Sequence, residues 1–80
     1  FNPSTVIEYA IPEEGRVKVT IYDLMGQEVT SLVNEDQIAG WHSVQWYGQD
    51  KRGISMPAGV YLISVNAGNS IKTMKLIFVK

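Results

Sequence analysis

The sequence has 80 residues, 45% of them hydrophobic, and a chain of this length forms one small domain rather than two. Its 7 basic and 8 acidic residues give a formal net charge of −1, which offers no electrostatic attraction to nucleic acid or to an anionic membrane. It contains no cysteine, which excludes disulfides and thiolate metal sites, and it has no apolar run near the roughly 20 residues that span a bilayer.

Short runs rich in β-branched and aromatic residues alternate with turn-forming segments along the chain. The clearest run is 16–23, in which Val17, Val19 and Ile21 alternate with polar residues, as in a strand with one buried face. This number and spacing of short runs predict an all-β fold, a seven-stranded antiparallel β-sandwich. The predicted strands lie at about 5–11, 16–23, 27–33, 41–47, 54–56, 60–67 and 70–79.

The last predicted strand, 70–79, has an irregular pattern. Met74, Leu76 and Phe78 fall on one face, whereas Ile77 and Val79 fall on the other. Either a bulge shifts the register within this strand, or the strand is covered on both of its faces. In both cases we expect Met74, Leu76 and Phe78 to contribute to the core.

The sequence predicts no catalytic centre, so we expect a protein that is not an enzyme and that has no cofactor and no metal. The single histidine, His42, shares a predicted strand face with Val44 and Trp46 and is expected to be structural. One histidine cannot supply a histidine metal cluster. An acid–base pair of the glycosidase type is not expected either, because an 80-residue sandwich offers little cleft. The carboxylates in predicted loops are Glu13, Glu14, Glu35, Asp36 and Asp50.

Two weaker binding sites remain as alternatives. The loop "GQDKRG" at 48–53 offers Asp50 and Gln49 as oxygen ligands for calcium, but a turn closed by Asp50 and Gly53 is the favoured interpretation. The second alternative is sugar stacking on an exposed ring. Alternation predicts that Trp46 is buried and that Trp41, on the opposite face, is exposed.

The segment "PAGVY" at 57–61 is more specific. Pro57 ends a loop, Gly59 permits unusual backbone geometry, and Tyr61 begins an inward-facing row of side chains. A tyrosine near such a corner of a Greek-key sandwich often donates its hydroxyl to a backbone group. We therefore predict a structural role for Tyr61.

Several motifs in the same order resemble a known family over nearly the whole chain. They are "FNPST" at 1–5, "IYDLMGQEV" at 21–29, the W-x-G-x-D-x-x-G spacing from Trp46 to Gly53, "PAGVY" at 57–61 and the closing "KTMKLIFVK". The chain resembles the type A carboxyl-terminal sorting domains of the type IX secretion system. It also resembles the closely similar immunoglobulin-like domain of the flagellar hook-capping protein.

The resemblance to sorting domains implies a seven-stranded immunoglobulin-like β-sandwich that acts as a non-catalytic secretion signal. Such a signal directs its cargo across the outer membrane of a Gram-negative bacterium to the cell surface. The implied partners are the outer-membrane translocon, the cell-surface attachment machinery and an upstream cargo domain. Carried over by motif, the recognition candidates are Lys72, Lys75, Leu76, Val79 and Lys80, and the structural motif comprises Trp46, Gly48, Asp50, Gly53, Gly59, Val60 and Tyr61.

The chain departs from the family at one position. The family commonly has W-D-G where this sequence has Trp46-Tyr47-Gly48, which weakens the calcium alternative further. On the same resemblance, residues 1–80 are expected to be one monomeric domain cut from a longer secreted protein. The alternatives are an immunoglobulin-like structural or assembly module, of the hook-cap or spacer kind, and a carbohydrate-binding accessory module that uses Trp41.

Overall fold

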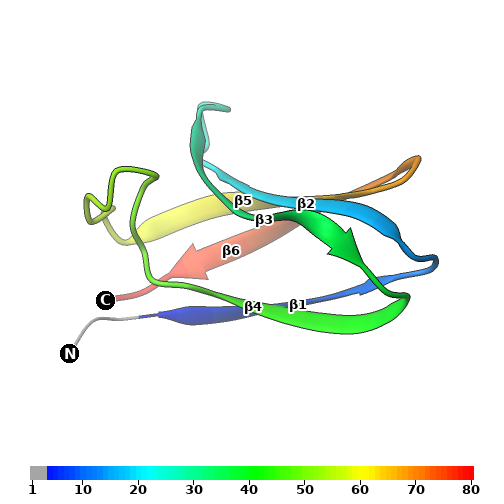
Figure 1. Cartoon of the computed structure of the whole chain (residues 1–80). Coiled ribbons are helices and arrows are strands. Elements are labelled where there is room, and N and C mark those ends of the chain that lie inside the picture. The colour runs from blue at the N-terminus through cyan, green and yellow to red at the C-terminus, as the bar shows by residue number, and fades with distance from the viewer. Residues whose placement is uncertain (1–3) are drawn as a thin grey trace.

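The computed structural model describes residues 4–80, in which six strands form two antiparallel sheets (Figure 1). A two-stranded sheet pairs β1 with β4, and a four-stranded sheet has the order β3-β2-β5-β6. The all-β prediction is therefore confirmed. The strands are β1 (Thr5–Ile11), β2 (Gly15–Tyr22), β3 (Glu28–Gln37), β4 (Gly40–Trp46), β5 (Gly59–Ala67) and β6 (Ser70–Phe78).

The seventh strand, predicted at 54–56, is not formed. Ser55 makes an isolated bridge with Gln49, and no ladder extends from this bridge within the described residues 4–80. The physical reason is the turn that Asp50 organises directly before this segment, because that turn folds the loop back on itself. Pro57 then follows, and a proline cannot donate to a ladder.

The period-2 pattern of the sequence sets the inner face of each sheet. Val17, Val19 and Ile21 of β2 are fully buried, as their alternation predicts. Side chains from all six strands meet in one core between the two sheets. Its buried members are Ile7, Tyr9, Ile11, Val17, Val19, Ile21, Val29, Val33, Trp46, Tyr61, Ile63, Val65 and Phe78.

The irregular pattern of the last strand has neither of the two predicted causes. β6 pairs with β5 from Gly59↔Phe78 to Ala67↔Ser70 without a register shift, and the shifts in this sheet lie between β2 and β3. The inward face of β6 contributes buried Phe78, with Met74 and Leu76 half-buried against the core. Its outward face is open, because Ile77 is 64% exposed. Apolar residues on both faces therefore reflect one buried face and one exposed apolar face.

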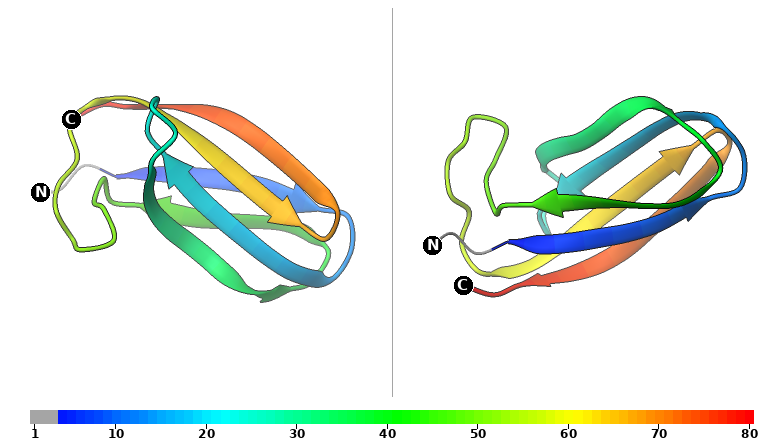
Figure 2. Two further views of the ribbon diagram at one scale, coloured as in Figure 1. Left: turned by 90° about the horizontal axis from the view of Figure 1, so that it is seen from above. Right: turned by 60° about the horizontal axis from the view of Figure 1, so that its bottom comes forward.

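The two sheets differ in width, and this difference leaves one strand uncovered. In both views of Figure 2, β4 lies on one side of β1 and β6 lies on the other. The inner face of β6 therefore extends past the free edge of β1. Within residues 4–80, no helix is long and apolar enough to span a bilayer.

Candidate functional site

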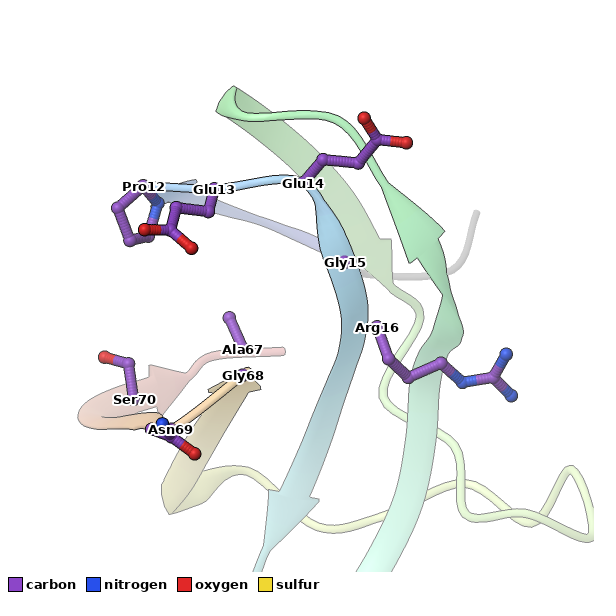
Figure 3. Close-up of a pocket in the computed structure, with 9 residues that line it drawn as sticks. All are labelled: Pro12, Glu13, Glu14, Gly15, Arg16, Ala67, Gly68, Asn69 and Ser70. Atoms are coloured by element: carbon purple, nitrogen blue, oxygen red, sulfur yellow. The ribbon is translucent and has the colours of Figure 1, made fainter.

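A shallow pocket of about 410 Å³ lies between the β1–β2 turn and the β5–β6 turn (Figure 3). Its charged lining residues do not converge, since Glu14 and Arg16 point away from the space between the two turns. Arg16 instead donates from Nε to Asn34 Oδ1 at 3.2 Å and lies 4.0 Å from Asp36. This pocket therefore lacks the few convergent polar groups that a small-molecule site needs.

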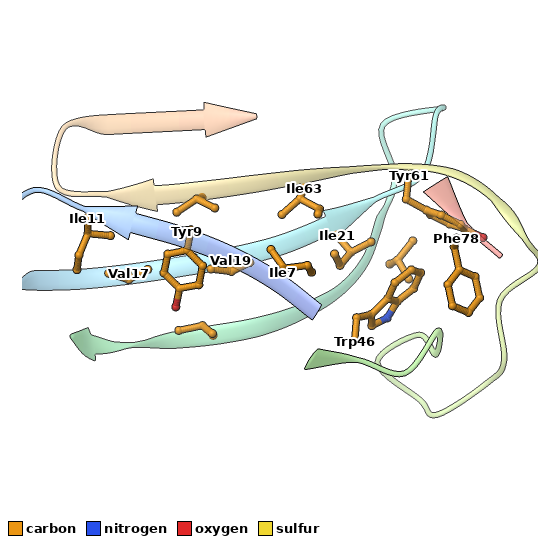
Figure 4. Packing of buried hydrophobic residues seen from close by; sticks show 13 residues of the cluster. Ile7, Tyr9, Ile11, Val17, Val19, Ile21, Trp46, Tyr61, Ile63 and Phe78 are labelled. Atoms are coloured by element: carbon orange, nitrogen blue, oxygen red, sulfur yellow. The ribbon is translucent and has the colours of Figure 1, made fainter. Parts of the chain in front are cut away.

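The motif residues gather at the opposite end of the molecule, around three rings that we call the aromatic corner: Trp46 from β4, Tyr61 from β5 and Phe78 from β6 (Figure 4). The Trp46 and Tyr61 ring centroids lie 5.1 Å apart in an edge-on arrangement, and those of Trp46 and Phe78 lie 4.9 Å apart. Edge-on and tilted contacts of this kind are favoured between aromatic rings. Because Trp46 belongs to one sheet and the other two rings to the second sheet, the corner joins the sheets.

Both polar atoms of the aromatic corner are bonded to the loop that connects β4 to β5. Trp46 Nε1 donates to the carbonyl of Gln49 at 3.0 Å, and the Tyr61 hydroxyl donates to the carbonyl of Pro57 at 2.5 Å. The hydroxyl bond confirms the structural role predicted for Tyr61. Burial, followed by the negative charge of Asp23, raises the pKa of Tyr61 above its ordinary value of 10.0, so the hydroxyl remains a donor at neutral pH.

Gly48 and Asp50 shape the loop beside the aromatic corner. Gly48 has a φ of +72°, and a Cβ built on it would lie 2.7 Å from Phe78 Cε2 and closer still to Cζ. Asp50 Oδ1 accepts the N–H groups of Arg52 and Ile54, each at 2.9 Å. The Gly53 N–H donates to the Asp50 carbonyl at 2.9 Å, so the predicted turn closed by these two residues is confirmed.

The hydrogen bonds of this turn also stabilise the charged form of the Asp50 carboxylate. The Ile54 N–H, with smaller contributions from the Arg52 N–H and from the nearby Arg52 and Lys51 charges, lowers the pKa of Asp50 below its ordinary value of 3.8. The carboxylate is thus used to close the loop. Within residues 4–80, no three His, Cys, Asp or Glu side chains are grouped so that they could hold a metal ion.

His42 is held in place by two contacts. Its Nε2 lies 2.7 Å from the carbonyl oxygen of Ile38, and its ring stacks on Tyr9 with centroids 5.7 Å apart. The Tyr9 hydroxyl in turn donates to Gln37 Oε1 at 2.7 Å. These contacts give His42 a structural role, as predicted. The role of Tyr9 was not predicted, although its place between Ile7 and Ile11 on the buried face of β1 signals that it is inward.

The five recognition candidates near the end of the chain do not form one surface. Leu76 is half-buried on the inner face of β6, whereas Lys75 lies at an outward position of the same strand. Lys72 lies opposite Val65, an inward position, and Lys80 Nζ lies 3.4 Å from Ser55 Oγ in the β4–β5 loop. Val79 lies beyond the end of β6 and is exposed. The shared sequence motif is therefore divided between two faces.

The outer faces of both sheets carry exposed apolar side chains. On the two-stranded sheet, Trp41 is 78% exposed opposite Ala10, which confirms the prediction for this ring. Tyr47 is also exposed, and its hydroxyl donates to Gln45 Oε1 at 3.1 Å. On the four-stranded sheet the exposed residues are Ile71 and Ile77 of β6. Exposed aromatic and aliphatic residues of this kind suit contact with another protein surface.

Comparison with known proteins gives one consistent result. Residues 4–70 match the family model of the FlgD Ig-like domain. FlgD from P. aeruginosa is 26% identical with a TM-score of 0.70, over 90% of this chain and 57% of that one. FlgD from Xanthomonas campestris, whose structure was described with reference to the hook capping essential for flagellar assembly, is 27% identical with a TM-score of 0.72, over 92% of this chain and 56% of that one. No curated protein matches the sequence.

These matches correct the first interpretation of the motifs. The expected type IX secretion signal is wrong, since the family model and both solved structures are of FlgD. The expected route across the outer membrane to the cell surface is wrong for the same reason, as are the translocon, attachment machinery and cargo as partners. The chain spans somewhat more than half the length of the two FlgD chains. On the match to residues 4–70, the chain belongs to the FlgD Ig-like domain family.

Proposed function

We propose that this chain is one Ig-like domain and serves as a structural module of a FlgD-type hook-capping protein. The observation that carries the proposal is the family match over residues 4–70. The two FlgD structures support it, because they superimpose over 90% and 92% of the chain with TM-scores of 0.70 and 0.72. The printed description of the X. campestris protein supplies the process, hook capping in flagellar assembly.

The proposal includes the arrangement of the two sheets as an Ig-like sandwich of six strands. Its support is the single core to which both sheets contribute, together with the aromatic corner, which places Trp46 of one sheet against Tyr61 and Phe78 of the other. Side chains from two facing sheets fill the space between them in this way in sandwich folds. A sandwich of this kind is a rigid support for surfaces that bind other proteins.

The module is proposed to act by binding rather than by catalysis. The side chains of the types that most often take part in catalysis make structural contacts here. His42 contacts Ile38 and Tyr9, Asp50 accepts hydrogen bonds from the loop amides, and Tyr61 donates to Pro57. The exposed apolar side chains lie instead on the outer faces of the sheets, where they suit contact with neighbouring subunits. Trp41 is the strongest candidate for such a contact, because large aromatic residues carry much of the energy of protein interfaces.

An in-frame deletion tests the proposal in the organism that carries the gene. Removing the codons for residues 1–80 from the parent gene is expected to abolish swimming and to leave cells without complete hooks in electron micrographs. A plasmid copy of the intact parent gene is the control and restores both. Immunoblots with an antibody against the remaining part of the parent protein establish that the shortened protein accumulates. Normal hooks in cells that contain the shortened protein would contradict the proposal.

A further inference from the structure

The two sheets have four outer edges, and three of them are protected. The pairing of β3 with β2 contains two register shifts, which disturb the edge of the four-stranded sheet. The β6 edge carries Lys72 and Lys75, and lysine on an edge strand opposes pairing with another chain. β4 follows β3 through a two-residue connection and lies in contact with it, so β3 crowds part of the β4 edge.

The free edge of β1 has none of these features. Its sequence TVIEYAI contains neither lysine nor proline, and its pairing with β4 runs from Thr5↔Trp46 to Ile11↔Gly40 without a shift. An edge of seven residues with regular pairing presents backbone N–H and C=O groups on alternate residues to any strand that lies beside it.

β6 extends past the free edge of β1. Figure 2 places β6 on the side of β1 that is opposite to β4, so the inner face of β6 has no strand beneath it there. Among the inward positions of β6, Met74 and Leu76 are only half-buried against the core. A strand paired with β1 would turn its own inward side chains toward these two residues and complete their burial.

We propose that the free edge of β1 binds a single extended polypeptide segment, which pairs with β1 and covers Met74 and Leu76. The proposed occupant is a single strand rather than a second folded copy, because β6 projects past β1 on the side where a partner sheet would have to lie (Figure 2). The proposal rests on the strand geometry and holds independently of the role in hook capping.

The chemistry of the segment follows from the inward side chains of β6. Strand pairing places every second side chain on the inner face, so the segment carries apolar residues at alternate positions, opposite Met74 and Leu76. Lys72 occupies the next inward position along β6, toward the β5–β6 turn, and it belongs to neither of the two ion pairs among the described residues. A carboxylate on the segment at that end complements the charge of Lys72.

Synthetic peptides of about nine residues, the length of an ordinary strand, provide the probe. In each peptide valine alternates with threonine. One peptide has glutamate in place of its first valine and the other has glutamate in place of its last valine. One of the two can therefore bring its glutamate to Lys72 whichever way the peptide runs along β1. Addition to the whole chain is expected to shift the amide NMR signals of β1 and to slow their hydrogen exchange. One member of the pair is expected to bind more tightly than the other. A peptide of the same length with proline at the threonine positions, which cannot donate to a ladder, is expected to give no shifts.

Two matched pairs of variants locate the binding surface. Met74→Lys places a charge where the segment packs and is expected to weaken binding about tenfold or more, whereas Thr73→Lys, on the opposite face of β6, leaves it within about twofold. Lys72→Ser is expected to remove the preference between the two glutamate peptides, and Lys75→Ser, on the outward face, to retain it.

Three results would overturn the proposal: no shift of the β1 signals with any peptide, shifts concentrated on β3 or β4 instead, or equal loss of binding in Met74→Lys and Thr73→Lys. NMR spectra of each variant without peptide establish that it is folded. If Met74→Lys does not fold, Met74→Glu and Thr73→Glu replace the pair. The location of the shifts in the unaltered chain decides the proposal without any variant.

Discussion

The aromatic corner and the last strand β6 both contain residues of the family motifs, and the structure uses these two regions differently. At the corner, Trp46 and Tyr61 are buried, and each has its polar atom bonded to a carbonyl of the β4–β5 loop. Along β6, by contrast, the motif residues are divided between an inner face and an exposed outer face. The motif residues at the corner therefore stabilise the fold, and they carry no information about what the domain binds.

The largest expected effect is at the centre of the corner. Trp46→Ala removes a ring that is 2% exposed and touches both Tyr61 and Phe78, and it is expected to cost about 3–5 kcal/mol of folding free energy. That cost approaches the whole stability of a domain of this size. Urea titration followed by circular dichroism measures it. The matched control is Trp41→Ala, which is expected to change the stability by less than about 0.5 kcal/mol. Similar costs for the two tryptophans would contradict the comparison.

The next largest effect is at Gly48. Gly48→Ala combines a positive φ with overlap between the new methyl group and the ring of Phe78, which cannot move without losing its contact with Trp46. We expect a loss of about 2–4 kcal/mol. Gly53→Ala separates the two causes, because Gly53 has a φ of +83° and nothing within 4 Å of the added methyl group. It should cost only about 1–2 kcal/mol. Equal thermal shifts for the two variants would show that the overlap has no effect.

A smaller effect is expected at the hydroxyl of Tyr61. Tyr61→Phe keeps the ring packing but leaves the Pro57 carbonyl without this donor. The expected loss is about 1 kcal/mol in the free energy of unfolding. A thermal melt at neutral pH measures it, with Tyr47→Phe as the control, because the Tyr47 hydroxyl is bonded to Gln45 at the surface. If Tyr61→Phe leaves the melting temperature unchanged, this hydrogen bond does not stabilise the aromatic corner.

The smallest effect is a pH dependence at Asp50. Its pKa is lower in the folded chain than its ordinary value of 3.8, so the folded state binds the proton more weakly than the unfolded state. The stabilisation is therefore fully present above about pH 5 and is lost as the pH falls through the folded pKa. Asp50→Asn keeps an oxygen acceptor for the turn but removes this titration. Unfolding curves between neutral and acidic pH should show a shallower loss for the variant, and parallel curves would contradict the assignment.

The sequence predicted local structure well because strand alternation is local. Val17, Val19 and Ile21 identify the buried face of β2 by spacing alone, and the Pro57–Tyr61 corner is contained in five consecutive residues. The pairing of β2 with β5 could not be predicted in the same way, because it depends on contacts between residues far apart in the chain. The predicted strand at 54–56 failed where the Asp50 turn redirected the backbone.

Function was the harder prediction, for a physical reason. The motifs that resemble a sorting domain include Trp46, Gly48, Asp50 and Tyr61, and the structure uses all four to build the corner and its loop. Any family with this corner needs similar residues at similar spacing, so these positions cannot separate one family from another. Exposed surface residues such as Trp41, which could distinguish one binding surface from another, belong to none of these motifs.

The most direct test of the account is to locate the parent protein in cells that are building flagella. Antibodies raised against residues 1–80, detected by immunogold electron microscopy, would show where the protein lies relative to growing hooks. A FlgD-type hook-capping role predicts label at the tips of incomplete hooks and its loss in cells that lack the gene. Label spread over the cell surface away from the hooks would contradict the account.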